Sequence, residues 1–145
     1  MGEIIDLTAS DGHAFNAYKA APDGSPKGGV VVIQEIFGVN EHIRDVTDGF
    51  AAAGYLAIAP ALFDRAERGV ELGYGPDDRE KGMATRGLVE WDDAVKDIIA
   101  AREAVTSAGK VGIVGYCYGG TVAWLGACKG SFDAASGYYG GGIHQ

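Results

Sequence analysis

The chain has few cysteines and tryptophans and no long apolar run. Its two cysteines, Cys117 and Cys128, lie along one predicted helical segment, and at about 1.5 Å per residue their separation is roughly 16 Å, beyond the reach of a disulfide. We therefore expect two free thiols, with Cys128 buried as a small apolar residue. Trp91 and Trp124 are expected in the core. No apolar stretch approaches the roughly 20 residues that span a bilayer, which excludes a membrane-spanning helix.

Basic residues are also scarce. Twelve Lys and Arg stand against 20 Asp and Glu, for a net charge of -8, and the basic residues are scattered. Nucleic acid and anionic membranes are therefore poor partners. Met1 to Asp6 lacks the basic start and apolar core of a secretion signal, so we expect a cytoplasmic protein. No metal is expected, because no group has ligand spacing, and no cofactor, because no phosphate-binding glycine pattern is present.

The order of the predicted elements indicates one α/β domain over residues 1–145. An N-terminal antiparallel hairpin pairs 3–9 with 13–20 around the turn Ser10-Asp11-Gly12. The expected strands that follow are 29–34, 55–59, 110–116 and 134–138, and the expected helices are 40–53, 78–88, 92–108 and 121–128, with a loop at 62–76. This alternation predicts a mostly parallel sheet with helices on both faces.

The segment from Gly115 to Gly120 reads Gly-Tyr-Cys-Tyr-Gly-Gly and joins a β-branched strand to a helix. A sharp strand-to-helix turn of this kind exposes a nucleophile and admits only glycine two positions before and after it. Cys117 is therefore the predicted nucleophile. The positive end of the following helix points at it and favours the thiolate over the thiol.

Three segments together resemble the dienelactone hydrolase (carboxymethylenebutenolidase) family of the α/β-hydrolase superfamily. They are Gln34 to Asn40 (Gln-Glu-Ile-Phe-Gly-Val-Asn), the Cys117 turn, and Gly137 to Gly140 (Gly-Tyr-Tyr-Gly). The resemblance implies hydrolysis of an ester or lactone, of the dienelactone type, through an acyl-enzyme on cysteine. It covers nearly the whole chain and corresponds to the N-terminal part of the family's domain.

The resemblance also implies roles for other residues. Glu35 is expected to contact the thiol and to help convert it to thiolate, although a strand-end carboxylate bound to an arginine is a compatible reading. The backbone N–H groups of Ile36 and Tyr118 occupy the positions of the two oxyanion donors. The side chains of Phe37 and Tyr118 are expected to line the pocket, and plain packing is the alternative. Arg79 lies where the family offers an arginine to the substrate carboxylate, and a solvated arginine is the alternative there.

A base for the nucleophile is missing. After Cys117 only Asp133 and His144 have the right chemistry, and neither has the right place; His13 and His42 lie in the hairpin and at a helix start. The resemblance implies that the family's aspartate and histidine lie in segments that would follow Gln145, in a C-terminal part that is expected to be absent.

Three further expectations follow from that incompleteness. The chain should be weakly stable, it should turn over poorly, and it should associate through the exposed edge of its last strand. The alternatives to a hydrolase are an inactive α/β-hydrolase scaffold that binds a ligand or partner and, with less support, a redox-sensing thiol.

Overall fold

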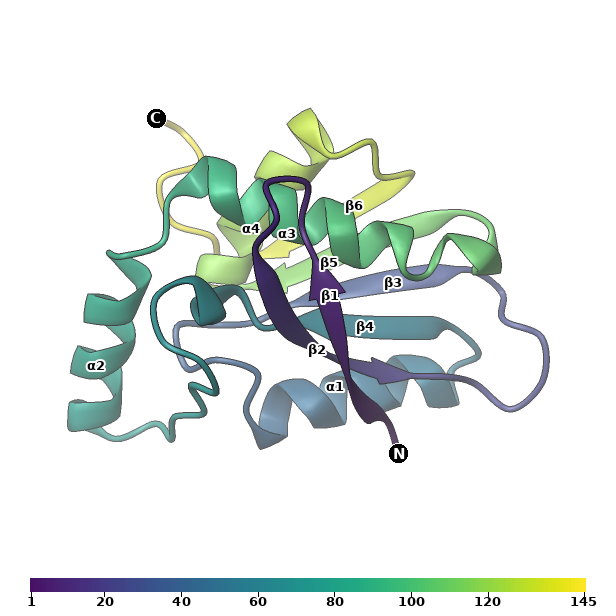
Figure 1. Cartoon of the computed structure of the whole chain (residues 1–145), viewed down its shortest axis with the longest axis horizontal. Helices are drawn as coiled ribbons and strands as arrows, with labels where there is room; N and C mark the ends of the chain where they lie inside the picture. The colour runs from purple at the N-terminus through teal and green to yellow at the C-terminus, as the bar shows by residue number, and fades with distance from the viewer.

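The computed structural model describes all 145 residues and contains one six-stranded sheet in the order β1-β2-β4-β3-β5-β6 (Figure 1). The strands are β1 (Glu3–Thr8), β2 (Ala14–Ala20), β3 (Gly29–Ile33), β4 (Leu56–Pro60), β5 (Val111–Tyr116) and β6 (Ala134–Tyr138). β1, β2 and β4 pair antiparallel, whereas β4, β3, β5 and β6 run parallel. The predicted hairpin and mostly parallel sheet are confirmed.

Helices cover both faces of the sheet, as the sequence pattern predicted. They are α1 (Glu41–Ala52), α2 (Pro76–Arg86), α3 (Trp91–Glu103) and α4 (Tyr118–Lys129), with the short 3-10 helices η1 (Leu62–Arg65) and η2 (Thr106–Ala108). Alternate residues of β3 point to opposite sides: Val31 and Ile33 join the core with α3 and α4, and Val30 and Val32 join the core with α1. This explains why β3 is apolar throughout, since both of its faces are buried.

Several predicted boundaries differ from the structure. The helix expected over 92–108 ends at Glu103, and η2 follows it as a separate turn. The loop expected over 62–76 begins with η1. α2 begins at Pro76, where the Asp78 carboxylate accepts a hydrogen bond from the Gly75 N–H at 3.3 Å. Local caps of this kind decide where a weakly amphipathic helix starts.

Cys128 and the tryptophans are more exposed than expected. Cys128 is exposed, Trp124 is 48% exposed and Trp91 is 36% exposed. On α4 the residues that face the sheet include Val122 and Ala123. Trp124 and Cys128 lie four residues apart on the outer side of this helix, so both remain accessible to solvent.

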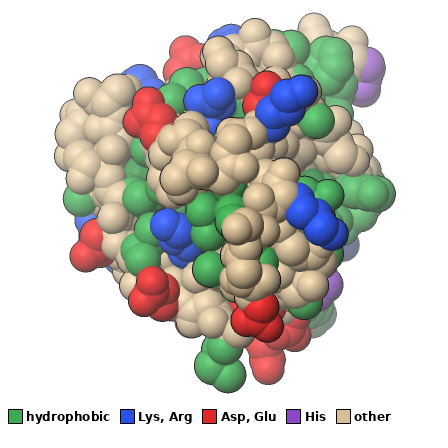
Figure 2. All heavy atoms as spheres, turned by 90° about the vertical axis from the view of Figure 1, so that its right-hand side faces the viewer, with side chains coloured by type: hydrophobic (Ala, Val, Ile, Leu, Met, Phe, Trp, Pro, Cys, Tyr) green, Lys and Arg blue, Asp and Glu red, His purple; other side chains and the backbone are tan.

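The surface carries no concentrated charge of one sign on the face shown in Figure 2, where Lys and Arg alternate with Asp, Glu and apolar side chains.

β6 forms one edge of the sheet, and all five of its residues are exposed. The longest helix, α3, has 13 residues, and none of the helices combines the length and apolar character needed to cross a membrane.

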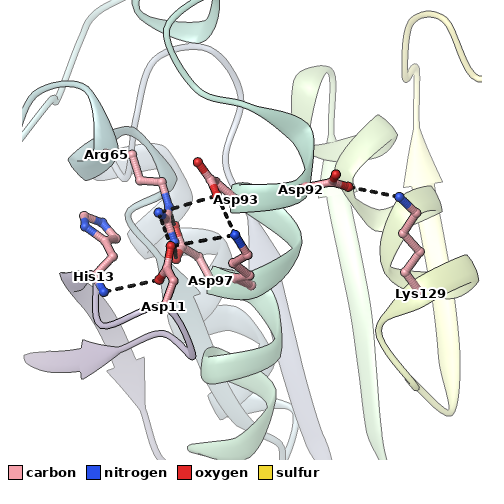
Figure 3. A network of polar contacts seen from close by, with 8 residues as sticks. Asp11, His13, Arg65, Asp92, Asp93, Asp97 and Lys129 are labelled. Carbon is pink, nitrogen blue, oxygen red and sulfur yellow. Dashed lines mark hydrogen bonds and ion pairs between the residues drawn. The ribbon is translucent and has the colours of Figure 1, made fainter.

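A buried ion pair holds η1 against α3 (Figure 3). The Arg65 guanidinium donates to both carboxylate oxygens of Asp97, at 2.9 and 2.8 Å, and also to Asp11 in the hairpin turn at 2.8 Å. Asp97 is fully buried. Burial raises the pKa of Asp97, and the hydrogen bonds and charge of Arg65 oppose that rise. Arg65 thus joins three segments that are distant in sequence.

Candidate active site

Cys117 lies in a strained turn between β5 and α4. Its φ is 57° and its ψ is -120°, a conformation that non-glycine residues adopt only when the surroundings impose it. The glycines around it permit this turn. A Cβ on Gly115 would lie 1.8 Å from the Gly119 carbonyl oxygen, and a Cβ on Gly119 would lie 2.4 Å from the Ile33 carbonyl oxygen. Both positions predicted from the motif to need glycine do need it.

Two backbone N–H groups near the turn have no acceptor within the chain. The Cys117 N–H donates to the Tyr138 carbonyl at 3.0 Å, whereas the Tyr118 and Ile36 N–H groups donate to no backbone or side-chain atom. Tyr118 is the first residue of α4, so its N–H belongs to the unsatisfied positive end of that helix. Ile36 follows β3, which is hydrogen-bonded to β5. The sheet therefore brings both donor segments to the same edge.

The loop that carries Ile36 is fixed from two sides. Gln34 is fully buried. Its side-chain amide donates to the Glu35 carbonyl at 3.0 Å and accepts from the Leu62 N–H at 3.1 Å. On the other side, α2 presents Gly82, where a Cβ would lie 2.3 Å from the Ile36 carbonyl oxygen. The absence of a side chain at Gly82 lets α2 approach this loop closely.

Glu35 is half-buried, and its partner is a tyrosine rather than an arginine. The Tyr74 hydroxyl donates to the Glu35 carboxylate at 3.0 Å, and no arginine forms an ion pair with it. A second tyrosine, Tyr139, lies near the same carboxylate. Partial burial of its phenol raises the pKa of Tyr139, and the charges of Glu35 and Cys117 raise it further. The Tyr139 hydroxyl therefore lies close enough to Glu35 and Cys117 for their charges to affect its pKa.

The two predicted substrate-contacting residues lie beside Tyr74. The ring of Phe37 packs edge-on against Tyr74 with 4.6 Å between centroids. Arg79 is exposed on α2, has no carboxylate partner, and lines a surface hollow of about 460 Å³ together with Tyr74 and Met83. The structure thus places Phe37, Arg79 and Glu35 around one tyrosine. Arg79 shows no contact with Cys117.

The Tyr118 side chain is part of the core. It is 5% exposed and packs against Phe63 and Trp91, with ring centroids 5.6 and 5.5 Å away. Its hydroxyl has no hydrogen-bond partner, and burial raises the pKa of Tyr118, so the phenol stays neutral. The pocket-lining role expected for its side chain is therefore wrong, and only the backbone N–H of this residue is left without a partner at the start of α4.

No histidine forms a hydrogen bond with Cys117. His13 stacks on Phe15 in the hairpin, His42 lies in the first turn of α1, and His144 is exposed near the C-terminus. Asp133 has a structural role, because its carboxylate accepts the Val111 N–H at 2.8 Å at the start of β5.

Sequence reasoning did not identify Tyr74 or Gly82. Tyr74 lies in a segment without periodicity, and only its aromatic character in a polar loop distinguished it. Gly82 lies in the interior of α2, where glycine destabilises a helix unless another element approaches closely. That unfavourable placement was the signal that could have found it.

The sequence profile of the dienelactone hydrolase family matches residues 15–145. The carboxymethylenebutenolidase of Pseudomonas putida is 38% identical, over all of this chain and 64% of its own length. Carboxymethylenebutenolidase 1 of Cupriavidus pinatubonensis is 32% identical over the same shares. The chain therefore spans about 64% of the length of these relatives.

Solved structures agree with the sequence match. A Klebsiella pneumoniae protein provisionally assigned as a dienelactone hydrolase superposes with a TM-score of 0.76 at 34% identity, over 95% of this chain and 60% of that protein. An α/β-hydrolase of Novosphingobium aromaticivorans shares the fold alone, with a TM-score of 0.58 at 17% identity over 88% of this chain and 40% of that one. The fold is that of the α/β-hydrolases, and the chain belongs to the dienelactone hydrolase family.

Proposed function

We propose that this chain carries the nucleophilic half of an ester or lactone hydrolase, with Cys117 as the nucleophile. The observation that supports this most strongly is the strained Cys117 turn, which follows β5 and is next to the Tyr118 N–H, a group without an acceptor. The Ile36 N–H, which also has no acceptor, follows the neighbouring strand β3. Strain of this kind persists where the surrounding structure imposes it, and it is common at active sites. Family membership supports a carboxylic ester as the bond that is cleaved.

The proposed reaction begins with the Cys117 thiolate, whose sulfur forms a bond to the carbonyl carbon of the substrate. The carbonyl oxygen becomes an oxyanion, which the Ile36 and Tyr118 N–H groups stabilise. Collapse of this intermediate breaks the carbon–oxygen ester bond and leaves an acyl thioester on Cys117, while the departing alkoxide takes up a proton. Water then hydrolyses the thioester to a carboxylic acid and restores the thiol.

Acylation and deacylation place different demands on the chain. Acylation needs the thiolate and the two donors, all of which this chain supplies in the proposed site. Deacylation needs water to be activated, and no histidine is bonded to Cys117. We therefore propose that the 145-residue chain is acylated faster than it turns over.

The proposed substrates are small esters and lactones. Arg79, which has no ion-pair partner, is proposed to bind a carboxylate of the substrate, and Phe37 is proposed to contact its apolar part. In a dienelactone-type substrate the leaving alkoxide stays attached to the acyl group, because the bond that breaks lies within the ring.

The alternative is a scaffold with the same fold that binds a ligand without chemistry. An acylation experiment distinguishes the hydrolase from the binding scaffold. An activated aryl ester such as p-nitrophenyl acetate should release one equivalent of phenolate rapidly from the wild-type chain and from Cys128→Ala, and none rapidly from Cys117→Ala. Equal release from all three proteins would contradict the proposal and favour the scaffold.

A further inference from the structure

Tyr74 is the side chain that holds the Glu35 carboxylate, and it lies outside every motif recognised in the sequence. Its hydroxyl donates to Glu35 Oε1 at 3.0 Å, and its ring packs edge-on against Phe37. The hydrogen bond fixes one carboxylate oxygen of Glu35. The charges of Glu35 and Cys117 and a hydrogen-bond interaction with Glu35 all raise the pKa of Tyr139, so this second tyrosine lies near both groups. Because Tyr74 holds one oxygen of the Glu35 carboxylate, the orientation of the other oxygen is also restricted.

Asn40 sets the direction of the Tyr74 hydroxyl. The Asn40 side-chain amide donates to the Tyr74 oxygen at 3.3 Å and to the Leu72 carbonyl at 3.0 Å. Its amide oxygen caps α1 by accepting the Ile43 N–H at 3.2 Å. Because Asn40 occupies a lone pair of the phenol oxygen, the hydroxyl proton is left to point at Glu35. A 6% exposed helix cap therefore orients the donor to an active-site carboxylate.

The Tyr74 phenol remains a donor at neutral pH. Although the Tyr74 side chain is 57% exposed, partial desolvation of its hydroxyl is the main cause that raises the pKa of Tyr74. The hydrogen bond from Asn40 lowers this pKa, and the hydrogen bond to and charge of Glu35 raise it. A neutral phenol donating to a carboxylate makes a charge-assisted hydrogen bond, which is stronger than a bond between neutral groups. The contact is therefore suited to restrain a side chain that would otherwise extend into solvent.

We propose that Tyr74 is a positioning residue that keeps the negative charge of Glu35 beside Cys117, through a chain of hydrogen bonds from Asn40 to Tyr74 to Glu35. This rests on the proposed role of Cys117. Loss of the Tyr74 hydroxyl frees the Glu35 side chain to turn into solvent. The negative charge of Glu35 then acts less strongly on the Cys117 thiol, although no charged residue has been removed.

The relative rate of two alkylating reagents reports this charge. Iodoacetate is anionic and iodoacetamide is neutral, so a nearby carboxylate slows the first relative to the second. The rates at Cys117 are measured by mass spectrometry in wild-type, Tyr74→Phe and Glu35→Gln chains. We expect the ratio of the iodoacetate rate to the iodoacetamide rate to rise about two- to fivefold in Glu35→Gln, the effect of one unit charge a few ångströms away in a water-like medium. In Tyr74→Phe the ratio should rise by most of the same amount.

Two controls complete the test. Tyr55→Phe removes the same hydroxyl from a tyrosine that packs against Phe50 and makes no hydrogen bond through its oxygen, and it should leave the ratio unchanged. Asn40→Ser keeps a cap for α1 but loses the amide donor, and it should raise the ratio less than Tyr74→Phe. Circular dichroism checks that each variant is folded.

The outcomes separate the two proposals. An unchanged or lower ratio in Tyr74→Phe, with a raised ratio in Glu35→Gln, overturns the role of Tyr74 and leaves Cys117 as the nucleophile. If Cys117 in the wild-type chain is alkylated no faster than Cys128, the proposed function fails and the role of Tyr74 fails with it.

Discussion

The backbone N–H of Cys117 donates a hydrogen bond of 3.0 Å to the carbonyl oxygen of Tyr138. The strained turn is thereby attached to the last residue of β6, a strand whose residues are all exposed. A Cβ on Gly120 would lie 2.5 Å from the same carbonyl oxygen. The position of the nucleophile thus depends on close contact between the start of α4 and an edge strand.

Replacing Gly115 with alanine should destabilise the protein strongly. The new methyl group would lie 1.8 Å from the Gly119 carbonyl oxygen, so the turn must open. We expect the free energy of unfolding to fall by about 3 kcal/mol, measured by urea unfolding. The matched control is Gly49→Ala in the middle of α1, where nothing lies within 4 Å, and which should raise stability by about 0.5–1 kcal/mol. Equal effects at the two sites would contradict this account of the turn.

The Gly82→Ala substitution should impair the site more than the fold. Alanine favours a helix interior over glycine by about 1 kcal/mol, but here its methyl group would lie 2.3 Å from the Ile36 carbonyl oxygen. α2 or the Ile36 loop must shift, and the Ile36 N–H must shift with it. We expect acylation of Cys117 by p-nitrophenyl acetate to slow about tenfold, in line with partial loss of an oxyanion donor. Unaltered acylation kinetics in a folded variant would contradict the expectation that α2 fixes the Ile36 loop for acylation.

Replacing Arg65 with methionine should destabilise the protein in a pH-dependent way. The change leaves Asp97 fully buried without its partner, which costs about 3–5 kcal/mol at neutral pH. Because burial raises the folded-state pKa of Asp97 above its ordinary value of 3.8, the ionised carboxylate lowers stability as the pH rises above that value. Arg65 opposes this rise in pKa, so in Arg65→Met the pKa of Asp97 is higher. The pH range over which ionisation of Asp97 lowers the stability then extends to higher pH.

The measurement is urea unfolding of the wild type and Arg65→Met at about pH 4 and about pH 7. The difference in unfolding free energy should be larger at the higher pH. A difference that grew toward acid pH instead would contradict a dominant role for either carboxylate. The hydrogen bond to Arg65 lowers the pKa of Asp11, so the stability that Arg65 contributes through Asp11 is also lost toward acid pH.

The local parts of the fold and site could be predicted from the sequence. The apolar run of β3, the cap at Asn40 and the glycines of the Cys117 turn each leave a short pattern of consecutive or closely spaced residues, so they are visible in the sequence even where the contacting segment is distant. The oxyanion donors could be placed because they belong to the backbone. Their position follows from the parallel pairing of β3 and β5.

The remaining features depend on contacts between distant segments. Asp97 is a buried carboxylate on α3, and its partner Arg65 is 32 residues away, so no local pattern connects the two. Gly82 acts on Ile36, and Tyr74 acts on Glu35 across 39 residues. The burial expected of Cys128 and Trp124 was wrong because apolar character does not show whether another segment covers the outer side of α4.

The exposed β6 edge should make the chain self-associate. Tyr138 is 52% exposed and stacks on Tyr116, with 5.4 Å between ring centroids, beside an unpaired strand edge. Sedimentation velocity should show an apparent mass that rises with protein concentration, and Tyr138→Lys should reduce this rise, because a charge on an edge strand opposes pairing. A concentration-independent monomer would exclude association through this edge.

The most direct test of the central claim is to locate the acyl group. The chain is incubated with p-nitrophenyl acetate, quenched in acid, digested and analysed by mass spectrometry. The account predicts one acetyl group on Cys117 in the early phase and little on the exposed Cys128. The corresponding peptide of Cys117→Ser should carry no acetyl group linked as a thioester. Equal acetylation of both cysteines, or acetylation of Cys128 alone, would contradict a nucleophile at Cys117.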